Sequence, residues 1–159
     1  MSAGQPTAGV EASLMVLAPK FCAAVLDALN GCTAAGLDAI VYETVRSPQL
    51  AALYYARGRT IIPPTATVTN APNETWTWHG YGLAVDVIHR VKQWDMPPSW
   101  FADVAAIFKR YGCKWGGDWR QKDLPHHQWA ACKPSPSNQA RALLAAGGLP
   151  AVWRAVGAA

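Results

Sequence analysis

Apolar residues recur at three- and four-residue spacing in several segments of the chain, which is the pattern of amphipathic helices. In the first segment Phe21, Val25 and Leu29 share one face, and Gly36 follows as a residue that often ends a helix. The dipeptide Ser47-Pro48 opens the next with a capping hydroxyl and a proline in the first turn. This spacing predicts helices over residues 19–36, 47–58, 98–111, 138–146 and 149–156.

Shorter segments, rich in β-branched and aromatic residues, lie between these helices and predict strands. They cover residues 39–45, 83–90, 113–115 and 127–131. Residues 59–75 are rich in Pro, Thr and Asn, and an irregular segment of this length in a compact domain is usually functional. Because strands and helices mix irregularly, without a repeat or a linker, we expect one α+β domain over residues 1–159, with a flexible tail at 1–10.

The composition is that of a folded domain. The chain has 159 residues, of which 51% are apolar and 15% charged, so it can bury a substantial core and is not globally disordered. Eight tryptophans are many for this length; core packing accounts for most of them, and a groove that binds sugar or peptide is the alternative. The net charge of +4 is scattered without a basic run, so nucleic acid is not an expected partner.

Neither a secretion signal nor a membrane span is recognisable. Residues 1–9 lack a basic segment before an apolar run, and a proline and two charged residues interrupt the apolar stretch 14–29. We therefore expect a protein that folds in the cytoplasm, without stable membrane insertion. The four cysteines lack Cys-x-x-Cys spacing, so we expect buried free thiols, although Cys113 and Cys132 could become neighbours across a hairpin.

The candidate chemistry begins at His79 and Asp86, which lie on either side of Gly80 and Gly82. They are an odd number of residues apart and cannot share one face of a straight strand, but the glycines let the backbone turn before the strand begins. A buried aspartate on an apolar strand is costly without a cation or hydrogen-bond partners. The alternative for Asp86 is an edge strand that faces water.

A second cluster, Asp123-Leu124-Pro125-His126, offers a third ligand and a spare carboxylate. Two imidazoles and one carboxylate suit zinc and leave its fourth position open for water, whose proton Asp123 can take. Pro125 favours an extended approach to His126. His127 competes for the ligand role, because adjacent residues of an extended segment point in opposite directions and periodicity does not choose between them. For Asp123 the alternative is a simple turn residue.

Residues 77–86 read Thr-Trp-His-Gly-Tyr-Gly-Leu-Ala-Val-Asp, and 115–128 contain Trp-Gly-Gly-Asp-Trp and then Asp-Leu-Pro-His-His-Gln. Upstream lie Thr-Val-Arg-Ser-Pro-Gln at 44–49 and Leu-Tyr-Tyr-Ala-Arg-Gly-Arg-Thr at 53–60. In this order they resemble the motifs of the M15 zinc peptidases, with Thr77 in place of the usual serine. In that family an aromatic residue is usual at the position of His127, which supports His126 as the ligand.

The resemblance covers about residues 40–128 and implies an α+β fold of the hedgehog/DD-peptidase type, in which a small antiparallel sheet carries the zinc site between flanking helices. It implies zinc bound by His79, Asp86 and His126, with Asp123 as catalytic base and Arg46 on the substrate or intermediate. The alternative for Arg46 is a surface position at a helix start, where its charge opposes the helix dipole. Further candidates for substrate contact are Gln49, Thr77, Tyr81 and Trp119, and packing is the alternative for the aromatic ones.

The Leu-Tyr-x-x-x-Gly-Arg-Thr stretch and the Gly-Gly-Asp-Trp loop look closest to the endopeptidase branch of phage endolysins. We therefore expect a monomer that hydrolyses the L-alanyl-D-glutamate bond of peptidoglycan stem peptides and stays in the cytoplasm until it is released to the cell wall. One alternative is a D-Ala-D-Ala carboxypeptidase or dipeptidase with the same site. Another is a zinc-containing module that binds cell wall without hydrolysis.

Overall fold

The computed structural model describes residues 9–159, and residues 1–8, most of the expected tail, lie outside the described part. Its helices are α1 (Pro19–Ala34), α2 (Pro48–Ala56), α3 (Pro98–Arg110) and α4 (Asn138–Ala155). Its strands are β1 (Ala39–Glu43), β2 (Ala84–His89), β3 (Cys113–Trp115) and β4 (His126–Trp129). Single 3-10 turns are η1 (Leu14–Val16), η2 (Glu74–Trp76), η3 (Trp78–Tyr81) and η4 (Gly116–Asp118).

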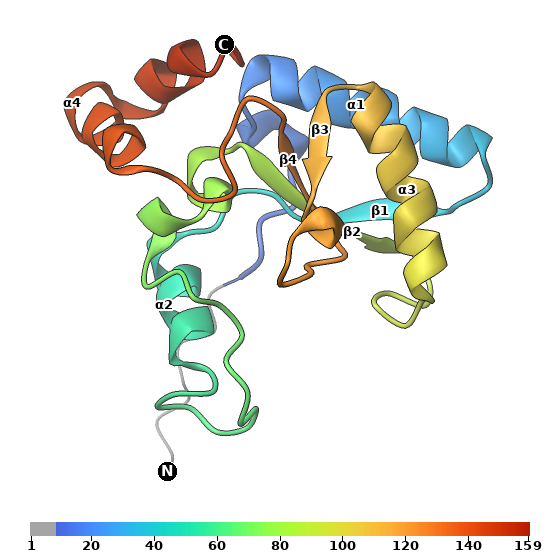
Figure 1. Cartoon of the computed structure of the whole chain (residues 1–159), viewed down its shortest axis with the longest axis horizontal. Coiled ribbons are helices and arrows are strands. Elements are labelled where there is room, and N and C mark those ends of the chain that lie inside the picture. Colours follow the sequence, from blue (N-terminus) through green and yellow to red (C-terminus); the bar gives the residue numbers. More distant parts are fainter. Residues whose placement is uncertain (1–8) are drawn as a thin grey trace.

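The four strands form one antiparallel sheet in the order β1-β2-β4-β3, which confirms the expected α+β architecture (Figure 1). β2 is an inner strand, hydrogen-bonded to β1 on one side and β4 on the other. The interpretation of Asp86 as a residue of a water-facing edge strand is therefore wrong. β4 begins at His126, one residue earlier than expected, and this places His126 inside the sheet.

Helices α1 and α3 lie side by side over one face of the sheet, whereas α2 lies apart from them (Figure 1). The core forms between these two helices and the sheet, because Phe21 of α1 and Phe108 of α3 are fully buried with Val85 and Val87 of β2. Burial of large apolar side chains is the main source of stability in such a layer. The opposite face of β2 is where the candidate site forms.

Helix ends lie close to where the sequence predicts them. Gly36 after α1 and Gly112 after α3 have positive φ angles of 72° and 86°, which glycine adopts at little cost. The Ser47 hydroxyl accepts a hydrogen bond of 3.1 Å from the backbone N–H of Leu50 and caps α2. Gly148 is non-helical and divides α4, so the two closing helices expected from the sequence are present as its two halves.

All four cysteines are free thiols, as expected. Cys113 and Cys132 form no disulfide, and only Cys22 is partly exposed. Within residues 9–159, no helix combines the length and the apolar character that a bilayer crossing needs.

Candidate metal centre

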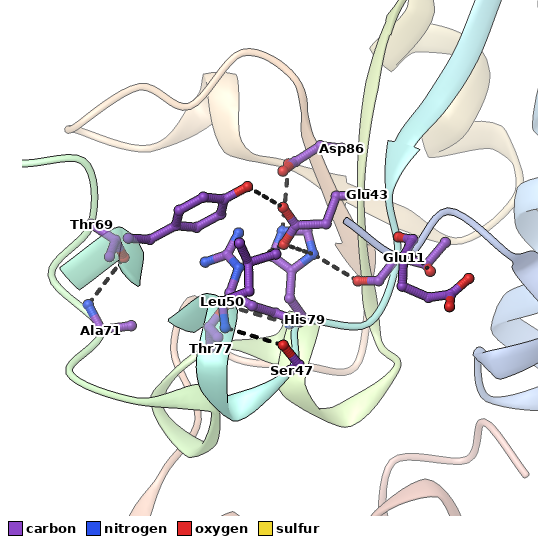
Figure 2. A network of polar contacts seen from close by, with 12 residues as sticks. Glu11, Glu43, Ser47, Leu50, Thr69, Ala71, Thr77, His79 and Asp86 are labelled. Carbon is purple, nitrogen blue, oxygen red and sulfur yellow. Dashed lines mark hydrogen bonds and ion pairs between the residues drawn. The ribbon is translucent and has the colours of Figure 1, made fainter. Parts of the chain in front are cut away.

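The register of the sheet places three polar side chains in one row. Asp86 of β2 lies opposite His126 of β4 on one side and opposite Glu43 of β1 on the other. Directly opposed residues of antiparallel strands project from the same face, with Cβ atoms about 5 Å apart. Figure 2 shows Glu43 and Asp86 pointing toward His79, which reaches the same point from outside the sheet.

A β-bulge in β1 makes this row possible. Ile40 and Val41 pair with Ile88 and Val87, but the next paired residue on β1 is Glu43 rather than Tyr42. A bulge sets two residues against one and re-aims the side chain that follows. Without this irregularity Tyr42 would stand opposite Asp86, and the carboxylate of Glu43 would turn to the other face.

His79 is held by the short turn η3 that precedes β2. The Thr77 hydroxyl accepts from the His79 backbone N–H at 3.4 Å, and Gly82 ends the turn in the left-handed region with φ of 67°. Gly80 has an ordinary backbone conformation, but a Cβ there would overlap the backbone carbonyl of Glu74. The two glycines are thus both required, one for the turn that the sequence predicts and the other for close approach.

His79, Asp86 and His126 each present a ligand atom, and these atoms lie within 4.8 Å of one another. Nε2 of His79 is 3.4 Å and Nδ1 of His126 is 3.8 Å from Oδ1 of Asp86. Both imidazoles are buried, and the Asp86 side chain is 18% exposed. A shared convergence point for two nitrogens and one carboxylate oxygen, with solvent access at one side, fits a catalytic zinc or a related divalent cation.

Partners behind the two histidines fix which nitrogen faces this point. Nδ1 of His79 donates to the backbone carbonyl of Thr44 at 3.0 Å, which leaves its Nε2 free. Nε2 of His126 donates to Oε1 of Gln128 at 2.8 Å, which leaves its Nδ1 free, and the Gln128 amide donates in turn to the Lys133 carbonyl at 2.8 Å. Such outer hydrogen bonds set the tautomer and orientation of metal-binding histidines.

The charges of the ligands also suit a cation. Burial would raise the pKa of Asp86, but His79 and then His126 hold it below its ordinary value, so this carboxylate is ionised. Burial, reinforced by His79, lowers the pKa of His126 to about 4, and its ring is neutral with a free lone pair. Burial acts in the same direction on His79, but Asp86 outweighs it and raises the pKa of that ring. A divalent cation would replace the His79 proton as the partner of Asp86.

Asp123 stands beside the three candidate ligands. Its Oδ2 is 3.9 Å from Nδ1 of His126, and its side chain is half-exposed. Burial of the remainder, followed by repulsion from Asp86, raises the pKa of Asp123 to about 6. Its backbone N–H donates to the Gly116 carbonyl at 2.9 Å, and any Cβ at Gly116 would overlap the Asp123 carbonyl. The glycine therefore allows the close approach that places this carboxylate.

Arg46 is buried, with 9% of its surface exposed, so its interpretation as a surface arginine is wrong. Its Nε donates to Oε1 of Glu43 at 2.6 Å, and Tyr54 donates its hydroxyl to the other oxygen of Glu43 at 3.2 Å. The Arg46 backbone N–H donates to the His79 carbonyl at 3.1 Å, which ties this group to η3. Charge-assisted bonds of this kind hold a guanidinium in one orientation.

Glu43 and Gln128 are among the polar residues of the site that sequence analysis did not single out for a role. Glu43 is 1% exposed, and Oε1 lies 3.8 Å from Nδ1 of His79, so it touches both the arginine and a candidate ligand. The available signal was a charged residue at the end of a strand of otherwise apolar residues, Ala39–Glu43. Such a residue is rarely buried without a partner.

An open cavity of about 910 Å³ contains the three ligands with Asp123, Arg46, Thr77 and Trp119. The Trp119 ring lies 4.8 Å from that of His126. Two other predicted contacts are not brought into the cavity. Gln49 is exposed on α2, and Tyr81 is fully buried with its hydroxyl donating to the Thr75 carbonyl at 3.0 Å.

His127, the competing histidine, points to the other face of the sheet. Its ring packs on Phe108 of α3 with 4.3 Å between the centroids, and its Nδ1 donates to the Pro125 carbonyl at 3.1 Å. The structure therefore groups His126, and not His127, with the other two ligands.

Two histidines and an aspartate around one point, with a second carboxylate beside them, define a centre of the kind that metal-dependent hydrolases use. Comparison with known proteins points to the same kind of centre. An M15 peptidase model described as D-alanyl-D-alanine carboxypeptidase matches residues 70–129, which include all three candidate ligands and Asp123. Over these residues the chain is similar to the M15 peptidases.

Among curated proteins, the peptidoglycan L-alanyl-D-glutamate endopeptidase CwlK of Bacillus subtilis is 34% identical over 113 residues. The alignment covers 63% of this chain and 66% of CwlK, just under two thirds of that protein. The crystal structure of the Serratia marcescens L-Ala D-Glu endopeptidase ChiX matches with a TM-score of 0.49 and 24% identity, over 73% of this chain and 82% of ChiX.

Proposed function

We propose that this chain is a zinc-dependent peptidase that hydrolyses the L-alanyl-D-glutamate bond of peptidoglycan stem peptides. The observation that carries the proposal is the convergence of His79, Asp86 and His126 within 4.8 Å, beside Asp123. The choice of bond is supported by the activity for which CwlK, a relative that is 34% identical, is named.

The donor set supports zinc as the metal. The three proposed ligands offer two imidazole nitrogens and one carboxylate oxygen. The hydrogen bonds from His79 to Thr44 and from His126 to Gln128 orient both rings before any ion binds. When bound, zinc acidifies water from a pKa of about 15.7 to roughly 7 and polarises the carbonyl that is attacked.

Asp123 is the proposed general base and, later, general acid. Its carboxylate is close enough to the ligands to accept a proton from the attacking water and return it to the departing amine of D-glutamate. The raised pKa of about 6 brings Asp123 near the operating pH, which favours proton transfer in both directions. Half of the side chain is exposed, so it can also exchange protons with solvent.

Arg46 is proposed to donate to the oxyanion that forms at the alanyl carbonyl. Its Nε is already bonded to Glu43, its terminal nitrogens form no hydrogen bond with any residue between 9 and 159, and Arg46 lines the cavity. A donor that is fixed before the reaction stabilises developing charge without reorganisation. Glu43 and Tyr54 are the residues that fix it.

Digestion of purified muropeptides followed by mass spectrometry tests the proposed bond. Cleavage should leave L-alanine on the muramoyl part and release a peptide that begins with D-glutamate. The family model that matches the site is described as D-alanyl-D-alanine carboxypeptidase, so the second candidate is removal of the terminal D-alanine. Release of free D-alanine with the L-alanyl-D-glutamate bond intact would establish that candidate instead.

Replacement of Asp123 by alanine separates an enzyme from a wall-binding module. We expect hydrolysis to fall about 10²- to 10⁴-fold while zinc content is unchanged, because Asp123 transfers protons and is not one of the three ligands. The measurement is hydrolysis of muropeptides beside metal analysis of the same preparation. Equal turnover by the two proteins would remove Asp123 from the mechanism.

The biological setting that we propose is lysis by a phage endolysin, a monomer that stays in the cytoplasm until it reaches the wall. Size-exclusion chromatography with light scattering tests the monomer. Addition of the purified, zinc-loaded protein to isolated sacculi tests wall degradation, and chelator-treated protein is the control. Sacculi that stay turbid with both preparations would count against this setting.

A further inference from the structure

A second guanidinium, that of Arg57, lines the same cavity as the candidate ligands. Arg57 is the C-cap of α2 and has extended backbone angles, so the chain leaves the helix at this residue. The following Gly58 has a φ of 80°, and a Cβ there would overlap the carbonyl of Ala66. The backbone of Arg57 is therefore fixed by a tightly packed turn, although its half-buried side chain is long.

The two arginines of the cavity differ in their partners. Arg46 forms a buried ion pair with Glu43 at 2.6 Å, so its charge is compensated within the protein. Arg57 forms no ion pair and its side chain no hydrogen bond with any residue between 9 and 159; its guanidinium lies 5.5 Å from the centre of the Tyr54 ring. That contact orients a cation without neutralising it.

Tyr54 connects the two guanidinium groups. Its ring lies 4.8 Å from Arg46 and 5.5 Å from Arg57, and its hydroxyl donates to Glu43. Both guanidinium groups thus contact one aromatic ring and line one cavity, and only the charge of Arg57 is uncompensated. A substrate whose scissile carbonyl lies at Arg46 could place a nearby anionic group against Arg57.

The substrate of the proposed function carries such an anion. In a stem peptide the D-glutamate residue is linked onward through its side-chain carboxyl, which leaves its α-carboxylate free. This carboxylate belongs to the residue whose amine departs, and it is attached to the same Cα as that amine. An arginine can bind this carboxylate through two parallel N–H donors. A carboxamide is neutral and has only one acceptor oxygen, so it cannot accept both bonds.

We propose that Arg57 binds the free α-carboxylate of the D-glutamate residue and makes the enzyme select D-glutamate over its amidated form, D-isoglutamine. The proposal rests on the function proposed above. Lys122 also lines the cavity, but it is less suited to this role. Its ammonium already donates to the Gly117 carbonyl at 3.0 Å, and a point charge cannot bind a carboxylate through two parallel donors.

The test compares two synthetic muramoyl stem peptides that differ only at D-glutamate, one with a free α-carboxylate and the other with a carboxamide. The full chain is loaded with zinc, and kcat and KM are measured for both peptides. Wild type should prefer the acid about tenfold to hundredfold in kcat/KM, mainly through KM, as expected for loss of one charge-assisted hydrogen-bonded pair.

Arg57→Met removes the charge but keeps the length of the side chain, and it should abolish this preference, mainly by raising KM for the acid peptide. Arg57→Lys should restore part of it. Arg110→Met is the matched control, because Arg110 is exposed at the end of α3 and lies outside the cavity. It removes an equal charge and should keep the wild-type preference.

The outcomes separate the two proposals. If wild type cuts both peptides between alanine and D-glutamate equally well, or if Arg57→Met slows both by the same factor, the role of Arg57 is refuted and the proposed function stands. If wild type cuts neither peptide at this bond, the proposed function fails and the role of Arg57 with it. Should Arg57→Met not fold, the preference of wild type and of Arg57→Lys still decides.

Discussion

His126 and His127 are adjacent, chemically identical and both buried, yet they lie in different parts of the molecule. His126 faces the cavity with Asp86, Asp123 and His79, whereas His127 faces the helices and packs on Phe108. Neighbouring residues of a strand point to opposite faces, so the sheet itself separates them.

The partners of each ring decide what it can do. Nε2 of His126 donates to Gln128, and its Nδ1 is free beside two carboxylates. Nδ1 of His127 donates to the Pro125 carbonyl, and its Nε2 is buried without a hydrogen-bond partner in residues 9–159. Burial lowers the pKa of both rings, to about 4 and about 3, so burial does not distinguish them. The comparison teaches that burial alone does not prepare a histidine to bind a metal, and that the neighbouring donors and acceptors make the difference.

The largest expected effect comes from removing the member of this pair that faces the cavity. His126→Ala removes one of the three proposed metal ligands and should lower muropeptide hydrolysis by about a thousandfold or more, with loss of zinc. Hydrolysis and zinc content per protein molecule are measured together, and His127→Phe is the matched control. Full zinc content in His126→Ala, or loss of zinc in His127→Phe, would reverse the assignment.

Removal of the partner behind His126 should have a smaller effect. Gln128→Leu deletes the acceptor of the His126 Nε2 proton and the donor to Lys133, but it leaves all three ligands in place. The ring then loses its preferred orientation, and zinc affinity should fall about tenfold to hundredfold. Competition with a chromogenic chelator gives the affinity. An unchanged affinity would show that the sheet alone orients His126.

The sequence predicts well what short-range chemistry decides. Gly36 and Gly112 end helices because positive φ is easy only for glycine, and Ser47 caps α2 with its own hydroxyl. These effects involve residues close in the chain, and they fix the elements within a few residues. The helix divided at Gly148 is predicted for the same reason.

The register of the sheet is less accessible to sequence analysis. The position of Glu43 depends on a bulge that sets it opposite Asp86, and no local sequence pattern predicts that bulge. Glu43, the residue that holds Arg46, was missed for this reason. Similarly, Gln49 lies near Arg46 in the chain, but its place in the first turn of α2 turns it to solvent.

On the helix side of the sheet, His127→Phe should stabilise the protein. The unpaired Nε2 is a polar atom taken from water without compensation, and phenylalanine replaces it with an apolar ring of similar shape against Phe108. The free energy of unfolding should rise by about 1 kcal/mol. Urea denaturation of metal-free wild type and variant gives this difference. A fall in stability would mean that the Nδ1 bond to Pro125 outweighs the unpaired atom.

The smallest effect concerns the thiols of the helix side, which should not respond to the metal. Burial raises the pKa of Cys32 to about 11 and of Cys113 and Cys132 to about 12, so these thiols stay protonated and unreactive at pH 8. Cys22 is the partly exposed one. A chromogenic disulfide reagent should therefore titrate one thiol quickly in native protein and four after denaturation. Chelation of the proposed metal should leave the fast count at one, because the three buried thiols belong to an apolar core cluster that contains none of the candidate ligands. A rise to three or four fast thiols after chelation would show that the two faces unfold together.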